Sequence, residues 1–203
     1  MGVFYFAFNL VFQGIKPLRS AFSCTTYGQA LYIYDKKPTY TCMSKKNLVI
    51  SYASYSQLEE LPPKDRELAE RAQASQALSY APYSHFRVGA AIRLQDGRLI
   101  GNANQENAAY SMCLCAERTA LATAASIAPG VCISAIAVTA SAERKLVSPC
   151  GACRQVLNET EIAQGSAIQI ILQGDEGGWL VFDSAKDILP FPFSPENLSG
   201  TTH

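Results

Sequence analysis

The sequence lacks a net charge, because 17 lysine and arginine residues balance 17 aspartate and glutamate residues. A balanced chain has no overall positive field to draw it to a nucleic-acid backbone or an anionic membrane. It also lacks an apolar run of the roughly 20 residues that a membrane-spanning helix needs. The nearest candidate, residues 3–12, is too short and is interrupted by Asn9. We therefore expect neither a nucleic-acid polymer nor a membrane as partner.

Targeting signals are also weak at the amino terminus. No lysine or arginine precedes the apolar run, so the basic start of a secretory signal is missing, and Phe6 stands where a myristoylation motif needs serine or threonine. From Met43 onward the composition is that of an ordinary globular domain. We expect residues 1–50 to be a poorly defined N-terminal leader, with residues 1–42 appended or mis-assigned, and residues 51–203 to form the functional domain.

Histidine is scarce, whereas cysteine occurs seven times in 203 residues. An odd number of cysteines, several of them in a tight local pattern, suits metal binding in a reducing compartment better than a disulfide framework. This pattern favours a cytoplasmic protein. With 48% hydrophobic and 17% charged residues, the chain can bury the core of one full-sized domain.

Hydrophobic periodicity predicts strands that alternate with helices after an initial hairpin. Asp96 and Gly97 supply the hairpin turn, while Ser148 and Pro149 are suitable as N-cap and first residue of a helix. Such an order predicts an α/β fold in which helices sandwich a mixed sheet. The expected helices are 64–80, 115–127, 148–159 and 184–189, and the expected strands are 86–94, 98–102, 131–140, 166–173 and 179–182.

Three cysteines lie at the starts of two of these predicted helices. Cys115 begins one helix, and Cys150 and Cys153 lie in the first turn of the next. A helix N-terminus favours the thiolate form, and three protein ligands leave one zinc coordination position open, as in catalytic sites. Glu117, two residues after Cys115, is placed to move protons. A Cys-x-x-Cys pair alone would be weak evidence, since it is more often a redox or structural motif.

The combination of Cys-Ala-Glu with Pro-Cys-x-x-Cys matches the signature of zinc nucleobase deaminases. Over residues 80–198 the chain resembles the small homotetrameric cytidine deaminases. The resemblance rests on Tyr-Ser-His-Phe at 83–86, Asn-Gln-Glu-Asn-Ala at 104–108, Cys-Ala-Glu-Arg-Thr-Ala at 115–120 and Ser-Pro-Cys-Gly-Ala-Cys-Arg-Gln at 148–155. It implies a three-layer α/β/α fold with a mixed sheet of about five strands, and deamination of free cytidine or 2′-deoxycytidine in pyrimidine salvage.

The resemblance also implies roles for the metal-site residues. Cys115, Cys150 and Cys153 would hold one zinc ion per chain, and Glu117 would take a proton from the attacking water and deliver it to N3 of the base. Arg118 would lie against a ligand sulfur and offset the negative charge of three thiolates on Zn²⁺.

Further roles concern the nucleoside. The resemblance implies that Asn104 and Glu106 bind the sugar hydroxyls, that Phe86 flanks the base and that Ala116 acts through its backbone. Tyr110 and Phe193 resemble aromatic residues that cross to neighbouring active sites in a homotetramer. A polar turn is the simpler interpretation of residues 104–107, and core packing is the simpler interpretation of the two aromatic residues.

Two other functions remain open at this point. A polynucleotide-editing deaminase shares the zinc chemistry but needs a basic groove for the strand. A structural zinc module would arise if Cys113, which stands where relatives usually have a small or aliphatic residue, closed the site as a fourth ligand. We expect Cys113 to be a packed free thiol and His85 to be a structural histidine.

Overall fold

The computed structural model describes residues 45–141 and 146–198. The predicted leader up to residue 44 lies outside these residues. Within them, no helix combines the length and apolarity that crossing a membrane requires. The strands are β1 (Ala53–Tyr55), β2 (Val88–Leu94), β3 (Leu99–Ala103), β4 (Ile133–Ala140), β5 (Gln169–Gln173) and β6 (Trp179–Phe182), and the helices are α1 (Pro63–Ser75), α2 (Ala116–Ile127), α3 (Gly151–Gln164) and α4 (Ala185–Ile188).

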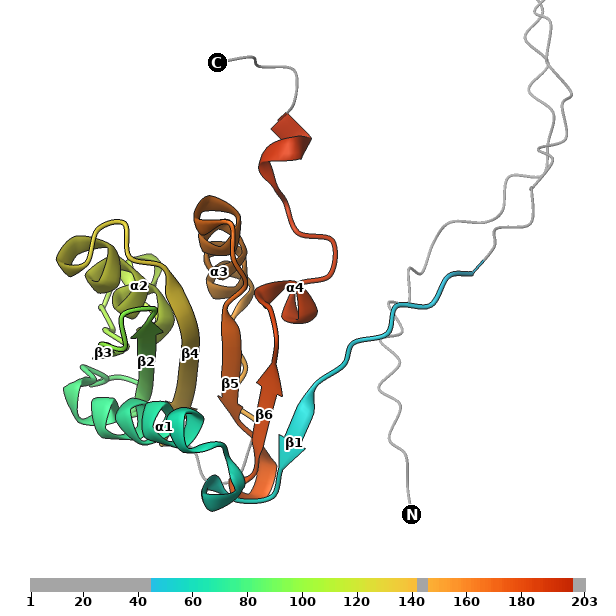
Figure 1. Cartoon of the computed structure of the whole chain (residues 1–203). Helices are drawn as coiled ribbons and strands as arrows, with labels where there is room; N and C mark the ends of the chain where they lie inside the picture. The colour runs from blue at the N-terminus through green and yellow to red at the C-terminus, as the bar shows by residue number, and fades with distance from the viewer. Residues whose placement is uncertain (1–44, 142–145, 199–203) are drawn as a thin grey trace, which may run out of the picture. The chain divides into compact units, whose positions relative to one another are not determined.

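The strands form one six-stranded mixed sheet in the order β1-β6-β5-β4-β2-β3 (Figure 1). β2 is antiparallel to both β3 and β4, so β3 and β4 run in the same direction and end at the same edge of the sheet. α2 follows β3 along the chain and α3 follows β4. Both helices therefore begin near that edge, and this topology brings their N-termini together.

Helices cover both faces of the sheet. On one face α1 packs against β2 and β3, where Gly89 and Gly101 permit close approach: a Cβ at Gly89 would lie 2.1 Å from the Ala72 carbonyl oxygen. This layer buries Leu68, Ala72 and Trp179. The opposite face packs against α2, α3 and α4, with Ile92 and Ile136 among the buried sheet residues. The result is a three-layer α/β/α arrangement.

A buried carboxylate joins α3 to the C-terminal part of the fold. Glu161 accepts hydrogen bonds from the backbone N–H groups of Ile168 and Ala185, at 2.7 and 2.8 Å, and from the Ser184 hydroxyl at 2.8 Å. Ser184 is also the N-cap of α4, with a complete capping box. The short helix α4 is thereby held against α3.

The α/β class and the mixed sheet between helices are confirmed, but the sheet has six strands rather than about five. The additional strand, β1, has only three residues. The first helix ends at Ser75, earlier than residue 80, and the chain continues through a short 3₁₀ turn, Gln76–Leu78. The expected N-cap at Ser148 is wrong: Cys150 is the N-cap of α3, which continues to Gln164.

Candidate active site

Three thiols meet where α2 and α3 begin. Cys115 and Cys150 are the N-cap residues of the two helices, and Cys153 lies in the first turn of α3. The Sγ atom of Cys150 lies 3.8 Å from that of Cys115 and 3.5 Å from that of Cys153, and all three sulfur atoms lie within 4.8 Å of one another. Among the described residues, this is the group of cysteine, histidine and acidic side chains that is positioned to bind a metal ion.

The geometry and acidity of this group fit zinc. Thiolates at about 2.3 Å from a tetrahedral zinc lie about 3.8 Å apart, which agrees with the observed separations. Hydrogen bonding by Cys153, together with the nearby Arg118 and Cys150, lowers the pKa of Cys115 to about 5. The pKa of Cys153 is raised by its hydrogen bond with Cys115 and by burial. Close thiols of this kind need a cation before all can be ionised together, and a divalent metal supplies that charge.

Glu117 lies in the first turn of α2, beside the three thiols. Its side chain is only 4% exposed. Burial, with a smaller contribution from the charge of Cys115, raises the pKa of the Glu117 carboxyl above its ordinary value of 4.5. A carboxyl whose pKa moves towards neutral pH can both accept and donate a proton.

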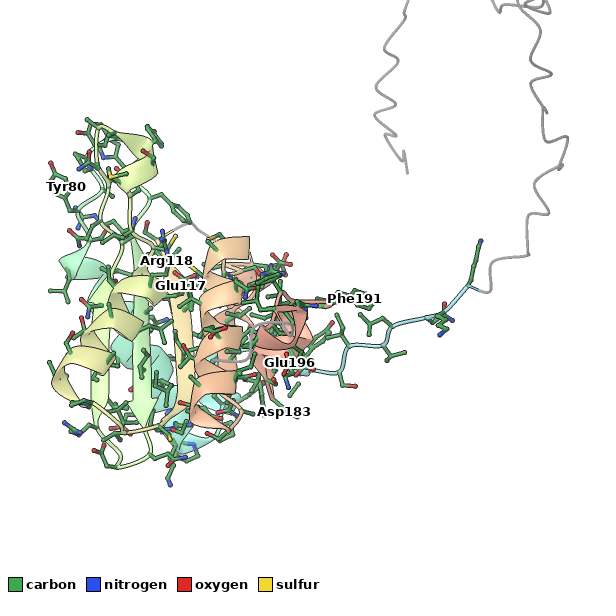
Figure 2. The ribbon with its side chains drawn as sticks, turned by 90° about the horizontal axis from the view of Figure 1, so that it is seen from above. Tyr80, Glu117, Arg118, Asp183, Phe191 and Glu196 are labelled. Atoms are coloured by element: carbon green, nitrogen blue, oxygen red, sulfur yellow. The ribbon has the colours of Figure 1, made fainter. Side chains whose placement is uncertain are left out.

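Arg118 contacts the same site from the next position on α2. Its Nη2 atom donates to the Cys113 carbonyl oxygen at 3.1 Å and lies 3.9 Å from Cys115 Sγ. Figure 2 shows Glu117 and Arg118 close together where α2 faces α3. The guanidinium group thus places positive charge beside a predicted ligand sulfur.

A cavity of about 520 Å³ is lined by Cys115, Cys150 and Glu117, while Cys153 is buried behind them. This volume lies within the range of small-molecule binding sites. The sequence does not single out the apolar wall formed by Val138, Leu146 and Val147, because none of these positions carries a recognisable motif. The residues that line the cavity are Phe86, Val88, Asn104, Gln105, Glu106, Tyr110, Cys113, Leu114, Cys115, Ala116, Glu117, Val138, Leu146, Val147, Ser148 and Cys150.

Asn104 bonds to the chain around the cavity through both polar atoms of its side chain. Its Oδ1 atom accepts from the backbone N–H of Val88 at 2.8 Å and from the Ser79 hydroxyl at 2.6 Å. Its Nδ2 atom donates to the Phe86 carbonyl oxygen at 2.9 Å. Asn104 therefore fixes the backbone that leads from Phe86 into β2. Any contact between Asn104 and a ligand would be made in addition to these bonds.

Glu106 holds the turn that precedes Phe86. One carboxylate oxygen accepts from the backbone N–H groups of Tyr83 and Ser84, at 2.9 and 3.3 Å, and the other accepts from the Ser84 hydroxyl. These bonds lower the pKa of the Glu106 carboxyl. The carboxylate thus remains ionised at the cavity wall and retains free lone pairs.

The remaining predicted residues differ in their positions. Ala116 lies in the cavity wall, and Tyr110 lies at the cavity with 76% of its surface exposed. Phe193 is not among the cavity-lining residues of its own chain; its carbonyl oxygen accepts a 2.7 Å hydrogen bond from Gln155. Cys113 lines the cavity but is not part of the three-thiol group, and its sulfur accepts a hydrogen bond from the Asn107 N–H.

A second cavity, of about 500 Å³, lies between the C-terminal half of α2 and α3. Its lining is mostly alanine and aliphatic residues, and its potentially reactive side chain is the free thiol of Cys132. The residues that line this second cavity include no carboxylate and none of the three grouped thiols. We therefore assign catalysis to the cavity at the N-terminal ends of these helices.

Comparisons with known proteins find cytidine deaminases among the relatives of this chain. The family model described as the cytidine and deoxycytidylate deaminase zinc-binding region matches residues 62–167, which include all three cysteines. The cytidine deaminase of Sporosarcina psychrophila is 46% identical over 122 residues, which are 60% of this chain and 85% of that protein. The enzyme of Halalkalibacterium halodurans is 43% identical over 121 residues, 60% of this chain and 87% of that protein. A crystal structure of cytidine deaminase from Burkholderia pseudomallei is similar with a TM-score of 0.56 and 42% identity, covering 63% of this chain and 97% of that one.

Proposed function

This chain belongs to the family of cytidine and deoxycytidylate deaminases, and from that membership we propose how its residues carry out the reaction. It is a zinc-dependent hydrolase that converts cytidine to uridine and releases ammonia. The observation that carries our assignment of roles is the cluster of three thiols, two of which line one cavity together with a buried carboxylate. We propose that 2′-deoxycytidine is a second substrate and that the reaction serves pyrimidine salvage.

We propose that Cys115, Cys150 and Cys153 are the zinc ligands and that Glu117 moves the protons. When bound, zinc would lower the pKa of water to about 7, which makes a nucleophile available at neutral pH. The Glu117 carboxylate accepts a proton from the attacking water and delivers it to N3 of the base. It then assists the departure of ammonia from C4. The raised pKa of Glu117 supports this role, because the group must both take and give a proton.

Arg118 offsets the negative charge of the three proposed ligand thiolates. Three thiolates and one Zn²⁺ carry a net charge of −1, which would weaken the metal as a Lewis acid. The 3.9 Å separation between Arg118 Nη2 and Cys115 Sγ supports a compensating role for this arginine.

The nucleoside is held by other residues that line the same cavity. We propose that Asn104 and Glu106 bind the sugar hydroxyls, that Phe86 packs against the base, and that Ala116 contacts the base through its backbone. Polar groups placed to pair with a hydroxyl discriminate against ligands that lack it, since a missing bond costs about 1–3 kcal/mol. Their common position on the cavity wall supports this assignment.

We further propose that the enzyme is a homotetramer with shared active sites. Apolar side chains at the cavity support this, because Phe86, Tyr110 and Leu114 remain exposed in the single chain. Tyr110 and Phe193 would contribute to the site of a neighbouring copy. Sedimentation velocity tests the assembly: a stable monomer that turns over cytidine at full rate would refute it.

The domain assignment and the compartment are also proposals. β1 is the first element of the described fold, which supports a functional domain of residues 51–203 and a separate leader of residues 1–50. Intact mass of protein from its natural source tests whether residues 1–42 are absent, as we expect. Three thiols reserved for metal favour a reducing compartment such as the cytoplasm.

The deciding experiment follows cytidine conversion by ultraviolet absorbance, with and without a zinc chelator, alongside a single-stranded oligonucleotide. We expect turnover of cytidine that the chelator abolishes. Glu117→Gln should keep one zinc per chain but lose at least about a hundredfold in kcat, whereas Glu159→Gln, at an exposed position of α3, should retain full activity. Turnover of the oligonucleotide alone, or an active Glu117→Gln enzyme, would refute these roles.

A further inference from the structure

Arg154 bridges two segments that the reaction scheme above does not connect. Its Nε atom donates to the Pro149 carbonyl oxygen at 2.8 Å, and its Nη2 atom donates to the Ser148 hydroxyl at 2.6 Å. Its Nη1 atom donates to the carbonyl oxygen of Ile188, the last residue of α4, at 2.7 Å. One planar guanidinium group thus joins the segment immediately before Cys150 to the end of a separate helix.

Arg154 holds the two residues immediately before Cys150, whereas the backbone N–H groups of Leu146 and Val147 bond to Asp175 and Gln173. Cys150 has an extended N-cap backbone with no side-chain cap, and Pro149 has no N–H to donate. The Ser148 hydroxyl, which could have capped the helix, instead accepts from Arg154. Because the fork of donors in a guanidinium group is rigid, it fixes both acceptors relative to α3 and so fixes where Cys150 places its sulfur.

Arg154 and Arg118 therefore act on the site in different ways. Arg118 approaches the Cys115 sulfur, and its charge acts on the ligand itself. Arg154 donates to two carbonyl oxygens and a hydroxyl, so its effect on the metal passes through the position of the backbone. Groups that orient metal ligands typically change metal affinity by 10- to 100-fold when removed.

We propose that Arg154 is a positioning residue for the metal site, and that it makes zinc retention depend on the order of the end of α4. This inference rests on the zinc-ligand roles proposed above. The next residue extends the connection, since Gln155 Nε2 donates to the carbonyl oxygen of Phe193 at 2.7 Å. In the arm after α4, Phe191 is 92% exposed and directed away from α3 (Figure 2).

The test measures zinc release from the full-length holoprotein into an excess of a chromophoric chelator. Arg154→Gln should release zinc at least about tenfold faster than wild type, with Arg154→Lys and Ser148→Ala intermediate. The matched control is Arg66→Gln, because Arg66 is a half-buried arginine of α1, on the other face of the sheet, whose ion-pair partner is the exposed Glu70 at 4.0 Å. It should release zinc at the wild-type rate.

Hydrogen exchange in the same variants separates positioning from general destabilisation. In Arg154→Gln, exchange should accelerate in peptides covering residues 184–193 and remain unchanged in those covering α1 and β2. Zinc release within twofold of wild type, or acceleration of exchange throughout the fold, would overturn the proposal. If Arg154→Gln does not fold, Arg154→Lys and Ser148→Ala decide, and wild-type release rates in both would overturn it. A wild-type protein that holds zinc but leaves cytidine unchanged would refute the proposed function and leave this inference standing.

Discussion

Asn104→Ala tests whether one residue both builds the cavity wall and binds the ligand. The substitution removes three hydrogen bonds, to Val88, Ser79 and Phe86. Neutral hydrogen bonds contribute about 0.5–1.5 kcal/mol each, so the free energy of unfolding should fall by about 3 kcal/mol. Losing a further bond to the sugar should raise KM for cytidine at least about tenfold. Urea unfolding of the zinc-loaded protein and steady-state kinetics measure the two effects.

Asn102→Ala is the matched control, two residues earlier on β3. Asn102 makes a single side-chain hydrogen bond, to the Thr123 hydroxyl at 2.9 Å, and does not line the cavity. It should lose about 1 kcal/mol of stability and keep the wild-type KM. Equal losses of stability in the two variants would refute the structural part of the reasoning. An unchanged KM in a folded Asn104→Ala enzyme would refute the binding part.

Three further predictions concern the scaffold. Glu161→Gln should lower the free energy of unfolding by about 2 kcal/mol in urea relative to the exposed Glu159→Gln, and equal stabilities would show that the buried carboxylate does not secure α4. Gly89→Ala should cost about 2 kcal/mol in thermal unfolding, because the new Cβ would lie 2.1 Å from a carbonyl oxygen of α1; an unchanged Tm would contradict that close approach. The folded-state pKa of Glu106 is depressed, so its stabilising contribution is complete above about pH 4.5 and is lost as the pH falls through the lower folded value. Glu106→Gln should therefore flatten the acid limb of the stability curve, and an acid limb identical to that of wild type would argue against these bonds.

The periodicity of apolar residues was sufficient to predict the longer elements of the fold. It failed where three-dimensional contacts decide the outcome. β1 has three residues and no alternation, so only its pairing with β6 makes it a strand. The end of α1 was misplaced because Tyr80 N–H bonds to the Asn104 carbonyl oxygen and draws the chain away from the helix. The start of α3 was misplaced because the Ser148 hydroxyl is engaged by Arg154 rather than by the helix N-terminus.

The thiols and Glu117 could be located from sequence because their positions depend only on where two helices begin. The cavity wall could not be located in this way. Val138 and Leu146 reach it through the neighbouring strands and the segment before α3, and neither position has a local motif. The internal bonds of Asn104 were likewise invisible, because Ser79 is far from it in sequence. The location of Phe193 relative to an active site depends on other copies of the chain, so that prediction still awaits a test.

The proposed ligands would also make the metal a cross-link within the chain. Cys115 and Cys150 are 35 positions apart and belong to helices whose C-terminal halves line a cavity of about 500 Å³. A bond that closes a loop of this length reduces the entropy of the unfolded chain by an amount equivalent to about 4 kcal/mol, if a shared ion restrains the loop as a disulfide does. The ion would therefore fasten two helices that share a cavity at their other ends, and much of the stability of the enzyme should be a property of the zinc-loaded protein rather than of the polypeptide alone.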